Sequence, residues 1–392
     1  MLPCKGLILQ IKRLEYSGFL PTNKTRQNPS KELQSEKRRI IIALVFIFTN
    51  GLLTASTIIC AIKPITYESY GNNYTSFAFD YLIFLSTGLV HIAINMFLFF
   101  NKNFNLTIVE KVLCWKRKYP LKHKVNDSTV NLFLLNIVIL IICYSNIIVL
   151  VWYTDDDVSA ISISSRCVVY VAEVYYDGLI STFYRSLVCV IEDIFTSMNE
   201  RIEFILNSNN ELFDIVVIRE ILQDRQEIVR LCEKDLSGFY GVPIILLAIP
   251  TLLHAANEPF YIMTAWDKSN YSLDRSFVVL VNACIIWGIP WYVCFVMLYN
   301  QNAEEEANKT ARILSRISRR GNGMEKMVDK FLIKNMQQKP ILTAYGFFPL
   351  NKRTLFKIFA AIFTYMVILI QFKDMENTSK LLAETKTSTE VS

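Results

Sequence analysis

The sequence predicts an all-α polytopic membrane protein with seven transmembrane helices. Hydrophobic residues make up 52% of the 392 residues and the mean hydropathy is +0.31, above what a soluble domain of this size normally shows. The chain also contains seven apolar runs, each about long enough to cross a hydrocarbon core at roughly 1.5 Å per residue. Most of the chain is therefore expected to lie in lipid.

The seven candidate spans are separated by polar segments. They are Ile40–Ile62, Phe77–Phe100, Val130–Tyr153, Cys167–Ile191, Phe239–Met263, Phe277–Tyr299 and Lys352–Phe372. The fourth is interrupted by Glu173, Asp177 and Arg185, and ionisable groups are disfavoured in lipid. This run is expected either to span the membrane or to form a helix buried among the others.

Lys and Arg are concentrated in alternate segments between the spans, and these residues favour the cytoplasmic side of a membrane. One set of segments carries 32 of them and the other set carries seven. The first set, which we predict to be cytoplasmic, comprises 1–39, 101–129, 192–238 and 300–353. The second, which we predict to be extracellular, comprises 63–76, 154–166, 264–276 and 373–392. This orientation is the reverse of that of a G-protein-coupled receptor.

The orientation divides the chain into five parts. They are a cytoplasmic N-terminal segment at 1–39, six helices at 40–299 with helical cytosolic extensions at about 193–237, cytosolic helices at 300–351, a seventh helix at 352–372 and an extracellular tail at 373–392. Sequons for N-glycosylation fall in predicted extracellular segments at Asn73, Asn270 and Asn377. Four more fall on the predicted cytoplasmic side, where we expect them to be unused, at Asn23, Asn105, Asn126 and Asn308.

Two cytosolic segments carry helical patterns of their own. Residues 193–207 continue the fourth span, and Ser208-Asn209-Asn210-Glu211 has the spacing of a capping box that begins a new helix. The apolar stripe of that helix comprises Ile218, Ile221, Leu222, Ile228, Cys232 and Leu236, with Arg219, Glu220, Arg225 and Lys234 outside it. After a helical extension at 303–320, a short amphipathic helix carries Met324, Met327, Val328, Phe331 and Leu332. These patterns predict a cytosolic helical bundle rather than solvated charged loops.

The last span has one mixed face, and its other faces are apolar. Positions that recur at steps of four and three share a helix face, and here they are Lys357, Ala361, Thr364, Ile368 and Gln371. Carboxamides and hydroxyls cost free energy in lipid unless they are paired or wetted, so this face must meet protein or water. Both a pore lining and a seam between helices satisfy that requirement.

The end of the same span resembles a family signature. Thr364-Tyr365, five apolar residues and Gln371-Phe372 match the Thr-Tyr-x5-Gln-Phe signature of insect gustatory receptors without departure. The segment Ala344–Asn351 is also similar to that family's approach to its last helix, with Asn351 where an Asp is frequent. The two motifs cover only the C-terminal end of the chain, and the remainder agrees in length and hydropathy.

The resemblance implies a tastant-gated, nonselective cation channel in the plasma membrane of gustatory sensory neurons. Its partners would be a small-molecule tastant, permeant cations, membrane lipid and other gustatory receptor subunits in a homo- or hetero-tetramer, which the cytosolic helices would anchor. Gln371 and Phe372 would form the gate, with Tyr365 packed behind it. The other pore positions would be Lys357, Ala361, Thr364 and Ile368.

The resemblance also places the tastant in an outward-facing cavity lined by the second to sixth helices. Candidate residues in those spans are Asp80, Tyr144, Trp152, Glu173, Tyr176, Asp177, Asn257, Glu258, Tyr261 and Trp287. Aromatic and acidic side chains together suit sugars, by stacking, or cationic bitter compounds. Alternatively, the acidic residues pair with other groups inside the bundle. The apolar stretch Met366–Ile370 favours a bitter or fructose-like branch of the family.

Other functions have less support in the sequence. An insect odorant receptor subunit would share the architecture, but the intact signature favours the gustatory family. A secondary transporter would show an internal repeat and paired broken helices, and we find neither. We see no nucleophile with a base, no phosphate loop and no metal-ligand spacing, so no enzyme activity, cofactor or metal is expected. The basic residues expected to face water or lipid headgroups, and not nucleic acid, are Arg312, Arg316, Arg319 and Arg320.

Overall fold

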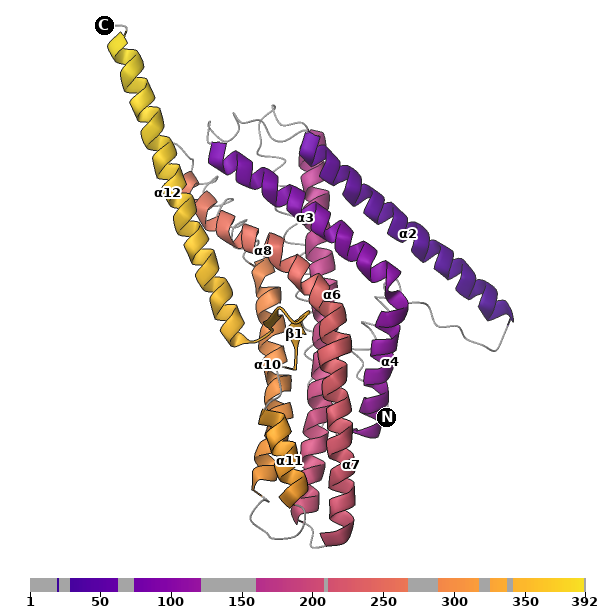
Figure 1. The fold of residues 1–392 in the computed structure, drawn as a ribbon. Helices are drawn as coiled ribbons and strands as arrows, with labels where there is room; N and C mark the ends of the chain where they lie inside the picture. The colour runs from indigo at the N-terminus through magenta and orange to yellow at the C-terminus, as the bar shows by residue number, and fades with distance from the viewer. Residues whose placement is uncertain are drawn as a thin grey trace.

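The structure is a computed structural model of the chain, and it describes Leu20 and residues 29–62, 74–120, 160–207, 211–266, 288–316, 325–336 and 341–390. Apart from one short hairpin, the regular elements in these ranges are helices (Figure 1). The all-α class is therefore confirmed. The third predicted span and the first part of the sixth lie outside the described residues.

The predicted spans that the structure describes are helical. The first, second and fifth spans and the end of the sixth are contained in α2 (Pro29–Ile62), α3 (Tyr74–Phe100), α8 (Ser237–Trp266) and α10 (Gly288–Ser315). α6 (Ala160–Asn207) contains the fourth span and continues beyond it, as predicted. α12 (Lys352–Glu390) begins with the seventh span but extends far past Phe372, so part of the predicted extracellular tail is helical.

Within the described ranges, four helical stretches are long and apolar enough to cross a membrane. They are Ile41–Ile59, Tyr81–Phe100, Val216–Leu253 and Lys352–Phe372. The third stretch runs from α7 (Glu211–Arg230) through a π-helix, η2 (Leu231–Leu236), into α8. Charged residues are frequent before Ser237 and rare after it, so we assign the crossing to α8.

α6 lies at the centre of the molecule. It packs against α2, α3, α4 (Lys102–Lys118), α7 and α10. Its side chains are completely buried at Leu187, Val188, Ile194, Phe195, Met198 and Ile202. Protein therefore covers most of the described part of the fourth span, although Tyr175 is 44% exposed. Burial among the other helices is compatible with a helix that crosses the membrane.

The helical bundle that the sequence predicts to be cytosolic, called the cytosolic bundle below, occupies the end of the molecule opposite the C-terminus (Figure 1). The apolar stripe of α7 packs inward as predicted, because Ile218, Ile221, Leu222, Ile228, Cys232 and Leu236 are each no more than 4% exposed. α11 (Glu325–Met336) likewise buries Val328 and Phe331. Arg312 and Arg316 are exposed, as predicted.

Arg225 is buried, and the prediction that it lies outside the packed face of α7 is wrong. The residue is 1% exposed. Its Nη2 donates hydrogen bonds to the Ala307 carbonyl oxygen of α10, at 2.7 Å, and to Asn335 Oδ1 of α11, at 2.8 Å. Helical periodicity identifies the apolar face of α7, but it does not identify the burial of Arg225. The long Arg225 side chain is buried because it reaches neutral hydrogen-bond acceptors on two other helices.

α4 lies against the cytosolic bundle and is held there by ion pairs. At the C-terminal end of α4, the Tyr119 hydroxyl donates a hydrogen bond to the carboxylate of Asp224 in α7. Burial of the Tyr119 side chain is the main cause that raises its pKa, and the hydrogen bond to the Asp224 carboxylate is the next largest cause. The Tyr119 hydroxyl therefore keeps its proton and remains a donor. The pairs are Lys111 with Asp235, Lys116 with Asp193 and Lys118 with Asp224, at N–O distances of 2.6, 2.7 and 2.6 Å.

Candidate pore helix and gate

A short hairpin joins the cytosolic bundle to α12. β1 (Thr343–Ala344) and β2 (Phe348–Pro349) pair antiparallel. The turn between them places Tyr345 at a φ of 50° and Gly346 at a φ of 81°. Glycine has no Cβ and adopts such a conformation without strain, which explains its use at the second position.

The hairpin is attached to the first turn of α8. Ser237 accepts a hydrogen bond at its carbonyl oxygen from the Tyr345 N–H, at 3.3 Å, and another at Oγ from the Thr343 N–H, at 3.1 Å. One turn later, Gly241 touches the hairpin backbone, because a Cβ there would lie 2.1 Å from the Tyr345 nitrogen. η2 ends at the residue before Ser237, and single π-turns are frequent at functional sites. The start of α8 is thus joined directly to the segment that leads into α12.

Asn351 caps the first turn of α12. Its Oδ1 accepts a hydrogen bond from the Thr354 N–H at 3.1 Å, and its carbonyl oxygen accepts one from the Leu355 N–H at 3.1 Å. Asn and Asp both satisfy the free N–H groups at a helix start, so the difference from the family's frequent Asp preserves the cap.

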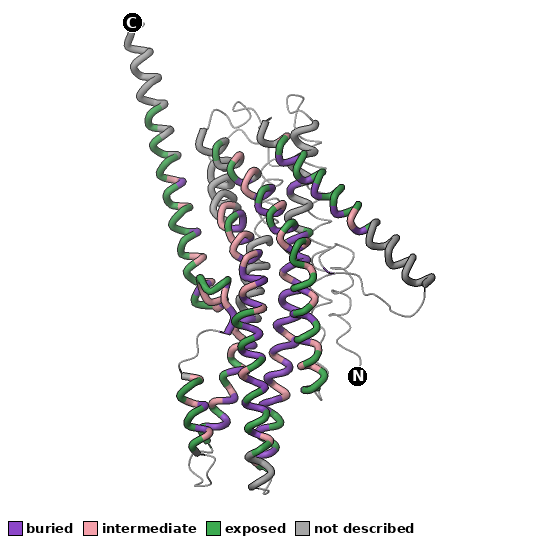
Figure 2. Tube along the Cα trace, turned by 45° about the vertical axis from the view of Figure 1, so that its right-hand side comes forward, coloured by how far each residue is buried: buried purple, intermediate pink, exposed green. Residues whose placement is uncertain are grey.

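α12 is largely exposed in the single chain. Only 11% of its membrane stretch is buried, the smallest share among the four apolar stretches. It packs against α8 and α10 through a face on which Thr354, Ile362 and Leu369 are buried. Figure 2 shows the rest of its described surface as mainly exposed.

The predicted pore row lies on the open side of this helix. Each of its residues is exposed, namely Lys357, Ala361, Thr364, Ile368 and Gln371. At about 100° of rotation per residue, most of the row points away from Ile362 and Leu369, with Ala361 at its edge. The described part of the chain therefore leaves the row free to meet water or another subunit.

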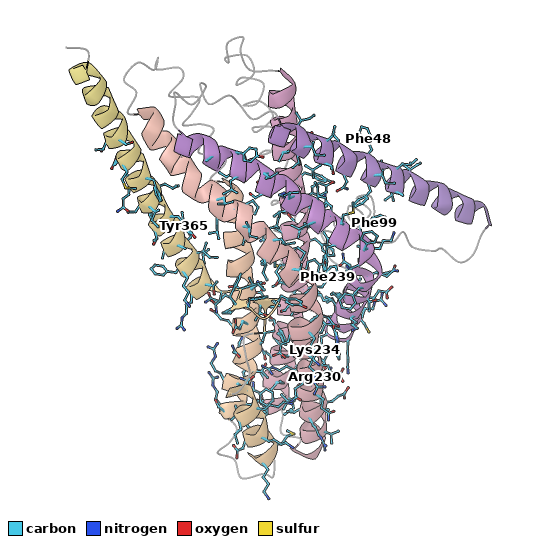
Figure 3. All side chains as sticks on the ribbon, turned by 45° about the horizontal axis from the view of Figure 1, so that its top comes forward. Phe48, Phe99, Arg230, Lys234, Phe239 and Tyr365 are labelled. Carbon is cyan, nitrogen blue, oxygen red and sulfur yellow. The ribbon has the colours of Figure 1, made fainter. Side chains whose placement is uncertain are left out.

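The predicted gate residues differ in their hydrogen bonding and are exposed to different extents. Thr364 Oγ1 donates to the Ala360 carbonyl oxygen at 2.9 Å, so its hydroxyl is paired within its own helix. The Gln371 carboxamide has no hydrogen-bond partner among the described residues. Phe372 is 52% exposed, and Tyr365, which is labelled on α12 in Figure 3, is 60% exposed. Among the described residues, Tyr365 therefore has no packing that would place it behind a gate.

The structure describes the side chain of only one predicted ligand residue. Tyr176, on α6, is 7% exposed and lies within hydrogen-bonding reach of Thr49 in α2 and Asn95 in α3. Asp80, Glu173, Asp177, Asn257, Glu258 and Tyr261 lie on helices, but their side chains are outside the described part, as is that of the sequon residue Asn377. The remaining predicted residues lie outside the described ranges, at Tyr144, Trp152, Trp287, Asn73 and Asn270.

Comparison with known proteins identifies the family. A family model described as 7tm Chemosensory receptor matches residues 14–376. Gustatory and pheromone receptor 39a, isoform A, of Drosophila melanogaster is 32% identical over 83% of this chain and 84% of its own length. The chain belongs to the insect gustatory receptor family. The receptor is also 49% identical to gustatory and pheromone receptor 32a of the same species, over 23% of this chain and 21% of that protein.

The receptor shares its fold with a solved chemoreceptor. The insect olfactory receptor OR5 from Machilis hrabei, determined in complex with eugenol, matches with a TM-score of 0.61 at 11% identity. The match covers 94% of this chain and 98% of that chain. The likeness confirms the predicted seven-helix membrane fold, and the family consists of chemosensory receptors rather than enzymes, as predicted.

The sequence analysis missed the attachment of the hairpin to α8. The receptor makes this contact through Ser237 and Gly241, neither of which belongs to a motif. The run Gly346-Phe347-Phe348-Pro349 contains a turn former and a residue that favours extended backbone, and it could have indicated the hairpin. Its partner on α8 could not be read from periodicity.

Proposed function

We propose that the receptor is a tastant-gated, nonselective cation channel, in which the α12 helices of four subunits surround a central pore in the plasma membrane of gustatory sensory neurons. The observation that carries this proposal is the exposure of the whole polar row of α12. Neither Lys357 nor Gln371 has an ion-pair or hydrogen-bond partner among the described residues. Because such groups are disfavoured in lipid, the row would face water in a pore.

The gate in this proposal lies at Gln371 and Phe372. Exposed apolar side chains at Ile368 and Phe372 would narrow the pore and close it by dewetting. Lys357 and Ala361, nearer the start of α12, would line the cytosolic half. Since Tyr365 is exposed in its own chain, we propose that it packs against α12 of a neighbouring subunit.

Coupling between tastant and gate would pass through α8. The predicted ligand residues Asn257, Glu258 and Tyr261 lie near one end of α8, and Ser237 and Gly241 contact the hairpin at the other end. Movement of α8 would therefore displace the hairpin and, through it, the start of α12.

The tastant class is part of the proposal. Bitter compounds and sugars are the first candidates, because the sequence carries both aromatic and acidic residues in the spans predicted to line the cavity. Pheromones are a second candidate, because two of the similar Drosophila proteins are named gustatory and pheromone receptors.

Accessibility of cysteines along α12 tests the pore assignment. Thr364→Cys and Gln371→Cys should react with a water-soluble thiol reagent and lower the ligand-evoked current. Ile362→Cys and Leu369→Cys, on the buried face, are matched controls that should not react. The unmodified receptor sets the baseline, because Cys114 is already exposed. Equal reaction on both faces, or none on the polar row, would reject the pore assignment in favour of a seam.

A further inference from the structure

The cytosolic bundle contains a cavity of about 650 Å³ between α7, η2, α11 and the hairpin. Its wall includes three cationic side chains, Arg225, Arg230 and Lys334, and Glu233 is the one carboxylate among the described lining residues. Arg230 is labelled near the end of α7 in Figure 3. The cavity is therefore positively charged.

The three cations of this cavity have no carboxylate partner among the residues that the structure describes. None of them forms an ion pair with a described residue, and Lys334 Nζ donates instead to the neutral Gln226 Oε1 at 2.9 Å. The chain segments next to α11, 317–324 and 337–340, contain no Asp or Glu. On α4, by contrast, Lys111, Lys116 and Lys118 each form an ion pair with a carboxylate. Within the described residues, the cavity therefore carries a net positive charge that no ion pair offsets.

Of the three cations, Arg225 is the one for which the lack of a counter-charge costs most, because its side chain is buried. It is 1% exposed, and its described hydrogen bonds go only to the neutral oxygens of Ala307 and Asn335. Its guanidinium carbon lies 5.0 Å from the centre of the Phe331 ring. Since Nε and Nη2 donate the described hydrogen bonds, Nη1 is the guanidinium nitrogen without a described partner. A buried cation without a counter-charge is disfavoured, and a bound anion would remove that cost.

The surroundings of the cavity indicate which anion fits. Guanidinium groups bind phosphate in a fixed, bidentate geometry, and a second and third cation favour a multiply charged ligand. Phe347, on the wall, is 77% exposed, and Pro349 immediately precedes the turn into the membrane stretch that starts at Lys352. The hairpin end of the cavity thus lies beside the start of α12, and we infer that it is close to the headgroups of the leaflet that α12 enters. Basic pockets at this level bind anionic headgroups.

We propose that this cavity binds a phosphate-bearing anion, either the headgroup of an inner-leaflet phosphoinositide or a soluble polyphosphate of the same chemistry. Bound there, the anion would join α7 and α11 to the hairpin. The site is separate from the outward-facing tastant cavity and does not depend on the channel proposal.

Direct binding to the purified full-length receptor tests the site. The probes are soluble inositol hexakisphosphate and phosphatidylcholine vesicles with or without phosphatidylinositol bisphosphate. The test variant is Arg230→Gln with Lys334→Gln, both exposed, so that the fold is retained. The control is Arg312→Gln with Arg316→Gln, which removes two exposed charges outside the cavity. Thermal unfolding checks that both variants fold.

The site predicts that the wild type and the control bind, and that the test variant binds at least about tenfold more weakly, since charge-assisted hydrogen bonds are lost. Binding of the lipid probe alone identifies a headgroup as the source, and binding of the soluble probe identifies a free phosphate. Equal loss in the control variant, unchanged binding in the test variant, or no binding of either probe to the wild type would overturn the proposal. An acidic segment of a partner protein would give the last result.

Discussion

A Cβ atom at Gly241 would lie 2.1 Å from the backbone nitrogen of Tyr345, so α8 and the hairpin meet with no room for a side chain. Two hydrogen bonds to Ser237 hold the same contact. Because the hairpin leads directly into α12, this contact joins the fifth membrane helix to the start of the proposed pore helix, in addition to the direct packing of α12 against α8.

Gly241→Ala should separate the hairpin from α8. A methyl group cannot fit beside the Tyr345 nitrogen, so the hairpin must move, at a cost of about 1–3 kcal/mol. We expect normal surface expression with a shifted ligand dose-response curve and altered maximal current. Gly238→Ala is the matched control, since a Cβ there meets nothing within 4 Å. If both variants gate like the wild type, the hairpin does not couple α8 to α12.

Phe372→Ala should weaken the closed state of the gate. Removing an exposed aromatic ring from a constriction makes the pore easier to wet, so current in the absence of ligand should rise. Phe363→Ala, which removes a 58% exposed ring away from the polar row, serves as the control and should leave basal current unchanged. Wild-type gating of Phe372→Ala at normal surface expression would contradict the gate assignment.

Asp224→Ala should loosen α4 from the cytosolic bundle. It removes the acceptor of the buried Tyr119 hydroxyl and the partner of Lys118, a loss of about 1–3 kcal/mol in the free energy of unfolding. The midpoint of thermal unfolding in detergent should fall accordingly. Glu220→Ala removes a more exposed partner of Lys118 and should cost at most about 1 kcal/mol. Equal midpoints for the two variants would show that the buried carboxylate does not hold α4.

Gly88→Ala should disturb the seam between α2 and α3. A Cβ at Gly88 would lie 2.2 Å from Thr57 Oγ1, whereas the same change at Gly51 meets nothing within 4 Å. Small residues let membrane helices approach closely, so the Gly88 variant should unfold at a lower temperature and reach the cell surface less efficiently. Gly51→Ala should behave like the wild type. Unimpaired folding of the Gly88 variant would mean that the two helices can separate without loss.

The sequence predicted the features that repeat along a helix. The stripe from Ile218 to Leu236 and the apolar stretch from Lys352 to Phe372 both follow from spacing, and both are helical in the structure. That the members of the polar row share one face of α12 was also predictable from their spacing, but their exposure does not single them out, because most of α12 is exposed. Arg225 was not predictable, since its burial depends on neutral acceptors from α10 and α11.

Contacts between segments far apart in the chain escaped the sequence. The pairing of Ser237 with Thr343 and Tyr345 needs only backbone groups, one hydroxyl and a glycine nearby, and these residue types occur everywhere. The π-helix before Ser237 likewise has no residue signature. Such tertiary contacts attach the segment before α12 to α8. This attachment was therefore found only in the structure.

The most direct test of the channel proposal is whole-cell recording from heterologous cells that express this receptor, alone and with other gustatory receptors, while G-protein signalling is blocked. The panel contains bitter compounds, sugars and pheromones. We predict a rapid, ligand-dependent cation current that persists under the block. A ligand response that disappears under the block, or no current in any combination despite confirmed surface expression, would contradict the proposal that this polypeptide forms the pore.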